Sequence, residues 1–396
     1  MRPGTVSLGR MRRALNHPLA WVVIGYLAWR RLWAFGEVTS LDLDVYIRGA
    51  HDLSSGLSPY RDVEGLPYTY PPFSALLFMP LTWLPTQVAH LVFLVVSAVS
   101  YLVLVAVFGR RLHWTPIEIA WVAVLALRLE PVVRTFHLGQ VNFLLAAAVA
   151  IDLFVVPARF RGMLIGLAAG VKLTPAVFGA AFLLQRDWGS ALRSVGTGVV
   201  TVIIGLAVLP GESWRYWTQL LRDPRRIGHL DYPDNQSLVG VAARAFGQDQ
   251  LPGTVMLPLQ LTGLALGCGA AWWCVRRARA AGRRPDLVAV ALCLAVASLL
   301  ASPVSWSHHW IWAVPGIMWL LHRRWWLAAL AWIAVLYAAN WLLPELRPGP
   351  VFDDPWWAST LPLLAVVTVL AGCWPGARGS LGRDRDVVDS AARQVP

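Results

Sequence analysis

The sequence predicts an all-α polytopic membrane protein, and three observations lead to that fold class. The mean hydropathy of the 396 residues is +0.54, and 22 of them are tryptophan, which favours a membrane domain over two or three soluble domains. Apolar stretches that are long enough for a bilayer recur along the chain. Arginine clusters separate these stretches, so the net charge of +12 indicates topology, and we expect no nucleic-acid partner.

The N-terminal part of the chain predicts one crossing followed by an external loop. Residues 1–17 carry four arginines and are expected in the cytoplasm, so the first span, 18–36, leads to the outer face. The external loop covers about 37–87. Its apolar part, 72–85, is short and interrupted by proline, so we expect a helix that lies at the membrane interface without crossing.

The remaining apolar runs alternate between basic blocks and polar segments, and together they predict about 12 passes in one transmembrane domain, 18–374. The runs are 88–108, 115–129, 143–156, 162–184, 191–210, 254–275, 286–302, 310–321, 325–343 and 358–374. Both ends of 162–184 adjoin arginine, so we split this run at Lys172 into two short helices that meet inside the membrane. We expect a second external loop at 211–253, a Pro-rich loop at 344–357 and a disordered cytoplasmic tail at 375–396.

The first external loop is rich in carboxylates. Five acids lie within about two dozen residues, although only 14% of the chain is charged: Asp42, Asp44, Asp52, Asp62 and Glu64. Such a segment is either a solvated loop or part of an active site. If the chain is extended there, Asp42 and Asp44 share a face and line one pocket.

Several motifs resemble glycosyltransferase family 87, whose members include the mycobacterial polyprenol-phosphate-mannose-dependent α-1,2-mannosyltransferases. The motifs, in the family's order, are LDLDVY, GLSPY, YPPF, GQVNF, GLAAGVKLTP, NQSL and SPVSWSHHW. The resemblance implies a GT-C-like multi-span bundle with its active site on the outer face. It also implies that Asp42, the acid of the D-L-x-V-Y pattern, is the catalytic base, while Asp44 at the variable position leaves the assignment open by two residues.

Cationic residues near these motifs are candidates for binding the phosphate of a lipid-borne sugar donor. They are Arg134, His137, Lys172, His308 and His309. Lys172 is the only lysine of the chain, and a buried lysine needs an anionic partner. Arg134 has a second interpretation, a structural pair with Glu130 at i,i+4 spacing. We find no further ligand set beside the two histidines, so no metal site and no cofactor are predicted.

Aromatic and amide side chains in the same motifs are candidates for binding sugar hydroxyls. They are Tyr46, Tyr70, Gln140, Asn142, Asn235 and Gln236. The outer-face position of these motifs favours an enzyme of the bacterial plasma membrane. The break at Lys172 is also compatible with a secondary transporter, which would show a matching break in its other half.

The expected partners are a polyprenyl-phosphate sugar donor, a glycolipid or glycan acceptor and the bilayer. The resemblance implies mannose and an α-1,2 linkage. The residues alone do not separate mannose from arabinofuranose, nor do they identify the acceptor.

Overall fold

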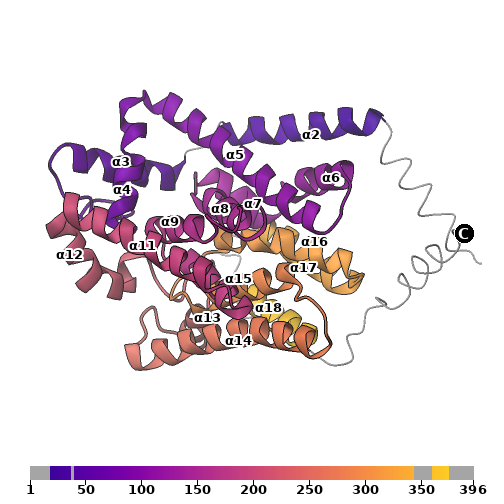
Figure 1. Cartoon of the computed structure of the whole chain (residues 1–396). Helices are drawn as coiled ribbons and strands as arrows, with labels where there is room; N and C mark the ends of the chain where they lie inside the picture. The colour runs from indigo at the N-terminus through magenta and orange to yellow at the C-terminus, as the bar shows by residue number, and fades with distance from the viewer. Residues whose placement is uncertain (1–17, 37–39, 343–358, 374–396) are drawn as a thin grey trace, which may run out of the picture.

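The computed structural model describes residues 18–36, 40–342 and 359–373, and every regular element in these ranges is helical (Figure 1). The α-helices are α2 (Pro18–Gly36), α3 (Leu41–Ser54), α4 (Pro72–Phe78), α5 (Thr86–Arg111), α6 (Pro116–Ala126), α7 (Glu130–His137), α8 (Asn142–Phe154), α9 (Met163–Val171), α10 (Ala180–Gln185), α11 (Trp188–Val208), α12 (Pro210–Thr218), α13 (Leu238–Phe246), α14 (Gly253–Ala280), α15 (Leu287–Ala301), α16 (Ala313–His322), α17 (Trp326–Leu342) and α18 (Thr360–Cys373). Five 3₁₀ segments accompany them: η1 (Met79–Trp83), η2 (Thr174–Gly179), η3 (Leu220–Arg222), η4 (Pro224–Arg226) and η5 (Ser307–Trp312). The predicted all-α class is confirmed, whereas the predictions for 1–17, 344–357 and 375–396 lie outside the described residues.

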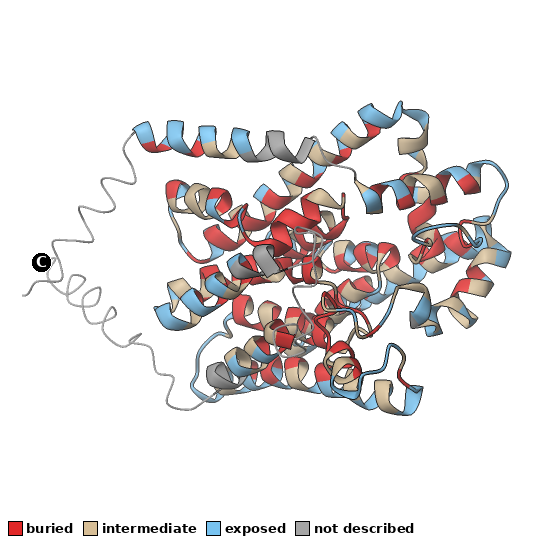
Figure 2. Cartoon of the chain, turned by 180° about the vertical axis from the view of Figure 1, so that it is seen from behind, coloured by how far each residue is buried: buried red, intermediate tan, exposed pale blue. Residues whose placement is uncertain are grey.

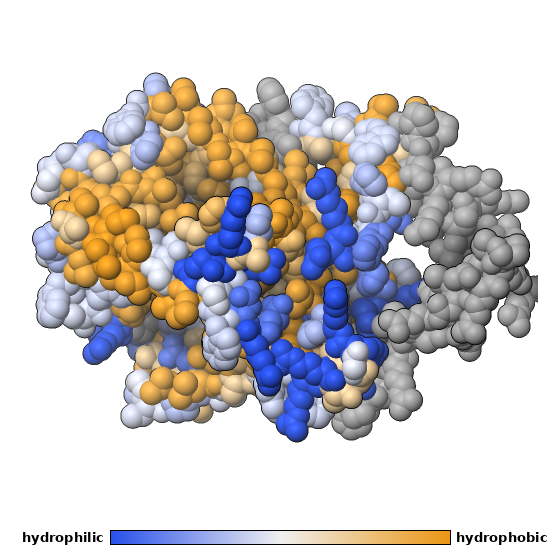
Figure 3. Space-filling model, in the orientation of Figure 1, coloured by the Kyte–Doolittle hydropathy of each residue, from blue (hydrophilic) through white to orange (hydrophobic). Residues whose placement is uncertain are grey.

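The protein is a membrane protein, and its long helices carry the apolar surface that lipid requires. Among the described residues, α5, α11 and α14 are long and apolar enough to cross a bilayer, and the bent pair of α7 and α8 gives a fourth candidate. Apolar side chains are exposed along α5 and α11, and Figure 3 shows broad hydrophobic areas on the surface beside a group of hydrophilic residues. The other apolar helices are shorter, so the count of about 12 passes stays a prediction.

The interior of the bundle is built around α7, α8 and η5. α8 packs between α5 and α9, and α7 lies against η5. In Figure 2 the buried residues gather in the middle of the molecule, while α2 lies at its edge, where it contacts α6. Functional segments that are far apart in sequence therefore meet inside the bundle.

The first part of the acidic segment is the helix α3, so the extended chain that would place Asp42 and Asp44 on one face is not formed there. Asp42 and Asp44 lie in the first turn of α3, where two residues of separation correspond to about 200° of rotation. The two carboxylates consequently face different sides. α3 packs on α4 and η1, the short apolar helices at 72–83.

The run 162–184 breaks at Lys172, as the sequence predicts. α9 ends at Val171, and the backbone of Lys172 is extended (φ −148°, ψ 131°) before η2 begins at Thr174. Buried Asp152 fixes the start of α9 by accepting hydrogen bonds from the backbone N–H groups of Gly162 (2.6 Å) and Ile165 (2.7 Å). The structure thus holds Lys172 at the end of a firmly anchored helix.

Candidate functional site

The α7–α8 turn positions the start of α3. The Leu138 carbonyl accepts a hydrogen bond from the Asp42 N–H at 2.9 Å. Gly139 has φ +64°, and a Cβ there would lie only 2.8 Å from Leu43 Cβ and 2.9 Å from Ser40 Cβ. Glycine is required by both the backbone conformation and the close approach. The glycine of the GQVNF motif therefore lets α3 dock on the turn.

The next polar residue of the motif, Gln140, joins two buried tyrosines. Its Oε1 accepts from the Tyr46 hydroxyl at 2.9 Å and from the Tyr70 hydroxyl at 3.3 Å, and the two hydroxyls are 2.9 Å apart. Burial, and after it the charge of Asp42, raises the pKa of Tyr70. Both phenols thus stay protonated and fix the Gln140 amide.

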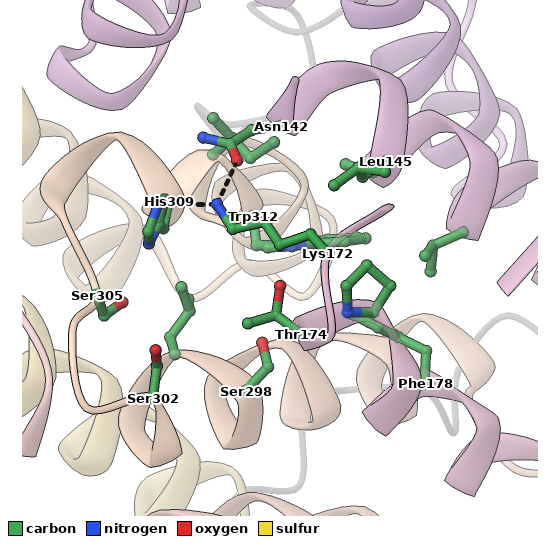
Figure 4. Close-up of a pocket in the computed structure, with 15 residues that line it drawn as sticks. Asn142, Leu145, Lys172, Thr174, Phe178, Ser298, Ser302, Ser305, His309 and Trp312 are labelled. Carbon is green, nitrogen blue, oxygen red and sulfur yellow. Dashed lines mark hydrogen bonds between the residues drawn. The ribbon is translucent and has the colours of Figure 1, made fainter. Parts of the chain in front are cut away.

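Lys172 reaches from the helix break to the same place. Its Nζ donates to Asn142 Oδ1 at 3.2 Å and lies 3.0 Å from His309 Nε2, and the ring of Tyr70 is 5.4 Å away (Figure 4). Burial, followed by the charge of Lys172, lowers the pKa of His309, so a neutral imidazole can accept from the amine. Asn142 in turn donates from Nδ2 to the His308 carbonyl at 3.1 Å, which ties the lysine to η5.

The two acids of the LDLDVY motif have different surroundings. Asp42 is half-buried and lies close enough to Lys172 and Tyr70 to interact with both electrostatically. Asp44 is exposed and pairs with His90 of α5 at 2.8 Å. Asp42 therefore faces the polar centre, whereas Asp44 joins two helices at the surface.

Arg134 lies in a separate buried ion cluster. Its Nη2 donates to Asp234 at 2.9 Å, and its Nε is 3.7 Å from Glu130, the i+4 pair that the sequence indicates. Ser307 completes the cluster by donating to Glu130 at 2.5 Å. With its charge balanced by two carboxylates, Arg134 has the surroundings of a structural residue.

Four further predicted residues lie around this ion cluster or beside it. The amide of Asn235 is used by the backbone, since Nδ2 donates to the Leu230 carbonyl (2.9 Å) and Oδ1 accepts from the Ser305 N–H (3.0 Å). Gln236 Nε2 donates to the Pro233 carbonyl at 2.8 Å. His308 is buried and within electrostatic range of both cations, and His137 is half-buried at the end of α7. The structure thus gives the Asn235 and Gln236 amides backbone partners and keeps both residues out of the wall of the Lys172 cavity.

A cavity of about 40 Å³ opens beside Lys172. Asn142, Lys172 and His309 line it together with four hydroxyl residues that the sequence reasoning missed: Thr174, Ser298, Ser302 and Ser305. Thr174, Ser302 and Ser305 lie in the quoted motifs and Ser298 lies in an apolar helix, but only the fold reveals that all four share one cavity wall. A cation, a neutral imidazole, an amide and several hydroxyls thus line one cavity, with Asp42 within electrostatic range of the cation, which suits the binding of a charged, hydroxyl-rich ligand.

Comparisons with known proteins agree with this geometry. The model of glycosyltransferase family 87 matches residues 68–303. A polyprenol-phosphate-mannose-dependent alpha-(1-2)-phosphatidylinositol mannoside mannosyltransferase of Mycobacterium tuberculosis is 32% identical over 90% of this chain and 91% of its own. The corresponding pentamannoside mannosyltransferase of Mycolicibacterium smegmatis is 33% identical over 93% and 92%. An alpha-(1->3)-arabinofuranosyltransferase of Corynebacterium glutamicum is 27% identical over 46% and 47%.

Proposed function

This chain belongs to glycosyltransferase family 87, and from that membership we propose that it moves a mannosyl residue from polyprenyl-phosphate mannose to a hydroxyl of a lipid-linked or glycan acceptor. Family membership makes the protein a glycosyltransferase, so the prediction of an enzyme and not a secondary transporter is confirmed. The observation that carries the proposal is that the half-buried Asp42 lies within electrostatic range of Lys172, whose cavity is lined by side chains suited to a sugar phosphate.

The proposed reaction is one in-line displacement at the anomeric carbon. The acceptor oxygen forms a bond to that carbon while the bond from the carbon to the phosphate oxygen breaks, and polyprenyl phosphate leaves with the electron pair. Asp42 takes the acceptor's proton, a contribution that is typically about 10²–10⁴-fold in rate. Lys172 supplies positive charge to the departing phosphate, and His309 and Asn142 hold the lysine in place.

Mannose is favoured over arabinofuranose by the extent of the similarities. The two mannosyltransferases match at least nine-tenths of this chain, whereas the arabinofuranosyltransferase matches less than half. The same relatives suggest an α-1,2 linkage and a phosphatidylinositol mannoside acceptor. Arabinofuranosyl transfer is the second candidate.

A direct assay tests the proposed function. Membranes that contain the protein are incubated with radiolabelled polyprenyl-phosphate mannose or polyprenyl-phosphate arabinofuranose, and the lipid products are separated. We expect label from the mannose donor to enter a larger glycolipid that an α-1,2-specific mannosidase releases. Incorporation of label from the arabinofuranose donor alone would show that mannose is the wrong sugar.

We also propose that Asp42 and Lys172 work on the outer side of a bacterial plasma membrane, in a multi-pass arrangement. The support is the distribution of arginine, since the block of five between Arg276 and Arg284 lies across the C-terminal end of α14, one of the three long apolar helices. Basic residues in short loops favour the cytoplasm. α3 then lies on the opposite side from this block.

Cysteine labelling in intact cells measures this sidedness. Ser55, just after α3, and Ala281, just after α14, are both exposed, and Ala281 avoids the strained φ of +64° at Gly282. We expect Ser55→Cys to react with an impermeant thiol reagent and Ala281→Cys to react only after the cells are opened, with the unsubstituted chain as the background control. Reaction of Ala281→Cys in intact cells would reverse the proposed sides.

A further inference from the structure

We propose that Ser305, with Ser298 and Ser302 beside it, forms the subsite that holds the hydroxyl groups of the transferred sugar. This inference rests on the proposed function and deepens it, because it names residues for a part of the substrate that the acid and the cation do not contact. The three serines come from the last turn of α15 and the segment that follows, and they line the cavity that also contains Lys172 (Figure 4).

The hydrogen-bonding state of the three hydroxyls differs. Ser298 Oγ donates to the Ala295 carbonyl at 2.8 Å, and Ser302 Oγ donates to the Val304 carbonyl at 2.6 Å. Each of these hydroxyls therefore offers only lone pairs to a ligand. Ser305 Oγ is fully buried and has no hydrogen-bond partner within the described part of the chain, so it can still donate.

A buried hydroxyl without a partner carries a free-energy cost that a ligand can relieve. Ser305 is held in place by its backbone, because its N–H donates to Asn235 Oδ1 at 3.0 Å and its carbonyl accepts from the Gln236 N–H at 2.7 Å. The side-chain amide of Asn235 and the backbone N–H of Gln236 thus act one step away from the sugar. They orient a serine that belongs to the cavity.

The size and chemistry of the cavity favour hydroxyl groups over a phosphate. A single water molecule needs roughly 10–15 Å³ of such space, so 40 Å³ takes about three water-sized groups, the edge of a sugar ring. Two acceptor-only hydroxyls would repel phosphate oxygens, whereas a sugar hydroxyl both donates and accepts. The phosphate would instead bind to Lys172. Two of the three N–H groups of its amine point to Asn142 and His309, and the third is left for the phosphate.

The position of the cavity assigns the hydroxyls to the sugar donor. The transferred sugar is attached to the phosphate through its anomeric oxygen, so a phosphate at Lys172 brings the ring to the same cavity wall. The acceptor approaches from the side of Asp42. Ser305 would then act in substrate binding, with no proton transfer of its own.

The test combines enzyme variants with altered donors. Wild-type protein and Ser305→Ala are purified in lipid and given polyprenyl-phosphate mannose or its 2-, 3-, 4- and 6-deoxy analogues, and kcat/KM is measured for each donor. With wild-type protein we expect kcat/KM for one deoxy donor to be about tenfold lower than for the mannose donor. The missing sugar hydroxyl leaves the Ser305 hydroxyl without a partner. With Ser305→Ala the same analogue should differ from mannose by less than about threefold, since the interaction has already been removed.

Two further variants keep the result interpretable. Ser97→Ala on α5 is the matched control, because Ser97 Oγ is equally buried and without a partner in the described structure but lies outside the cavity. It should leave the discrimination among donors unchanged. Ser298→Ala removes an acceptor from the same wall and should change discrimination at the same or a neighbouring sugar position.

Other results would overturn the inference. If the loss of kcat/KM caused by Ser305→Ala simply adds to the loss caused by each deoxygenation, Ser305 contacts no sugar hydroxyl. If Ser305→Ala lowers kcat/KM equally for all donors and also weakens binding of free polyprenyl phosphate, the serines contact the phosphate. If the effect of Ser305→Ala depends instead on which hydroxyl the acceptor lacks, the serines contact the acceptor. Absence of mannosyl transfer by wild-type protein would refute the proposed function itself. Transfer in which the effect of Ser305→Ala is the same for every donor would refute only the role of the serines.

Discussion

Replacing Asp42 by Asn is expected to lower the turnover of mannosyl transfer by about 10² or more while binding of the sugar donor persists. The amide keeps the size of the side chain but lacks an oxygen basic enough to take the acceptor's proton. The backbone N–H of residue 42 would still bond the Leu138 carbonyl, so α3 should stay docked. Initial rates of transfer in lipid, alongside a binding assay with the polyprenyl-phosphate sugar, measure both quantities.

Asp44→Asn is the matched control for Asp42→Asn. Asp44 lies in the same helical turn, but it is exposed and pairs with His90, so we expect a loss of only a few-fold. Collapse of turnover in Asp44→Asn with near-normal turnover in Asp42→Asn would move the base by two residues. Loss of donor binding together with turnover in Asp42→Asn would indicate an acid that organises the site.

Lys172→Met is expected to weaken use of the lipid sugar donor by about ten- to a hundredfold, mainly as a raised KM, while the protein still accumulates in the membrane. Methionine keeps an unbranched side chain that is one atom shorter and removes the charge that we propose for the phosphate. Lys172→Arg should rescue only in part, because Nζ sits between Asn142 and His309 in a space shaped for a compact amine.

Arg110→Met serves as the control for loss of a positive charge, since Arg110 is exposed at the end of α5. It should leave KM for the sugar donor unchanged. Failure of Lys172→Met to accumulate, with normal accumulation of Arg110→Met, would show that the lysine mainly holds Asn142 and His309 together.

The helical bundle was predictable because residues close to each helix end indicate where the helix stops. Arginines, prolines and the lone lysine mark the ends of most apolar helices, and α9 stops where Lys172 interrupts the run. The acidic segment was misjudged for a local reason. Leu41, Leu43 and Val45 alternate with polar residues like an extended chain, but Gly49 and Ala50 are buried on the same helix as Leu43.

The site was predictable by residue type but not by partner. Asn142, Lys172 and His309 do meet, as their polar character within apolar sequence suggests. Gln140 instead bonds to Tyr46 and Tyr70. The i+4 spacing indicates the pair of Arg134 with Glu130, yet the shorter contact is to Asp234, a hundred residues away. Ser305 lies within the SPVSWSHHW motif, but nothing in the motif singles it out, because a serine becomes notable only when the fold leaves its hydroxyl without a partner.

The wide spacing of the site along the chain has a consequence for biosynthesis. Asp42 and His309 are roughly 270 residues apart, and a ribosome adds about 5–20 residues per second, so the acid emerges some tens of seconds before the imidazole. A nascent chain that is arrested just before η5 already has Asp42, Lys172 and the three serines of the cavity, but it lacks His309. If His309 holds Lys172 in place as we propose, we expect sugar transfer to begin only after translation has passed η5, so that partly inserted chains do not use the lipid donors around them.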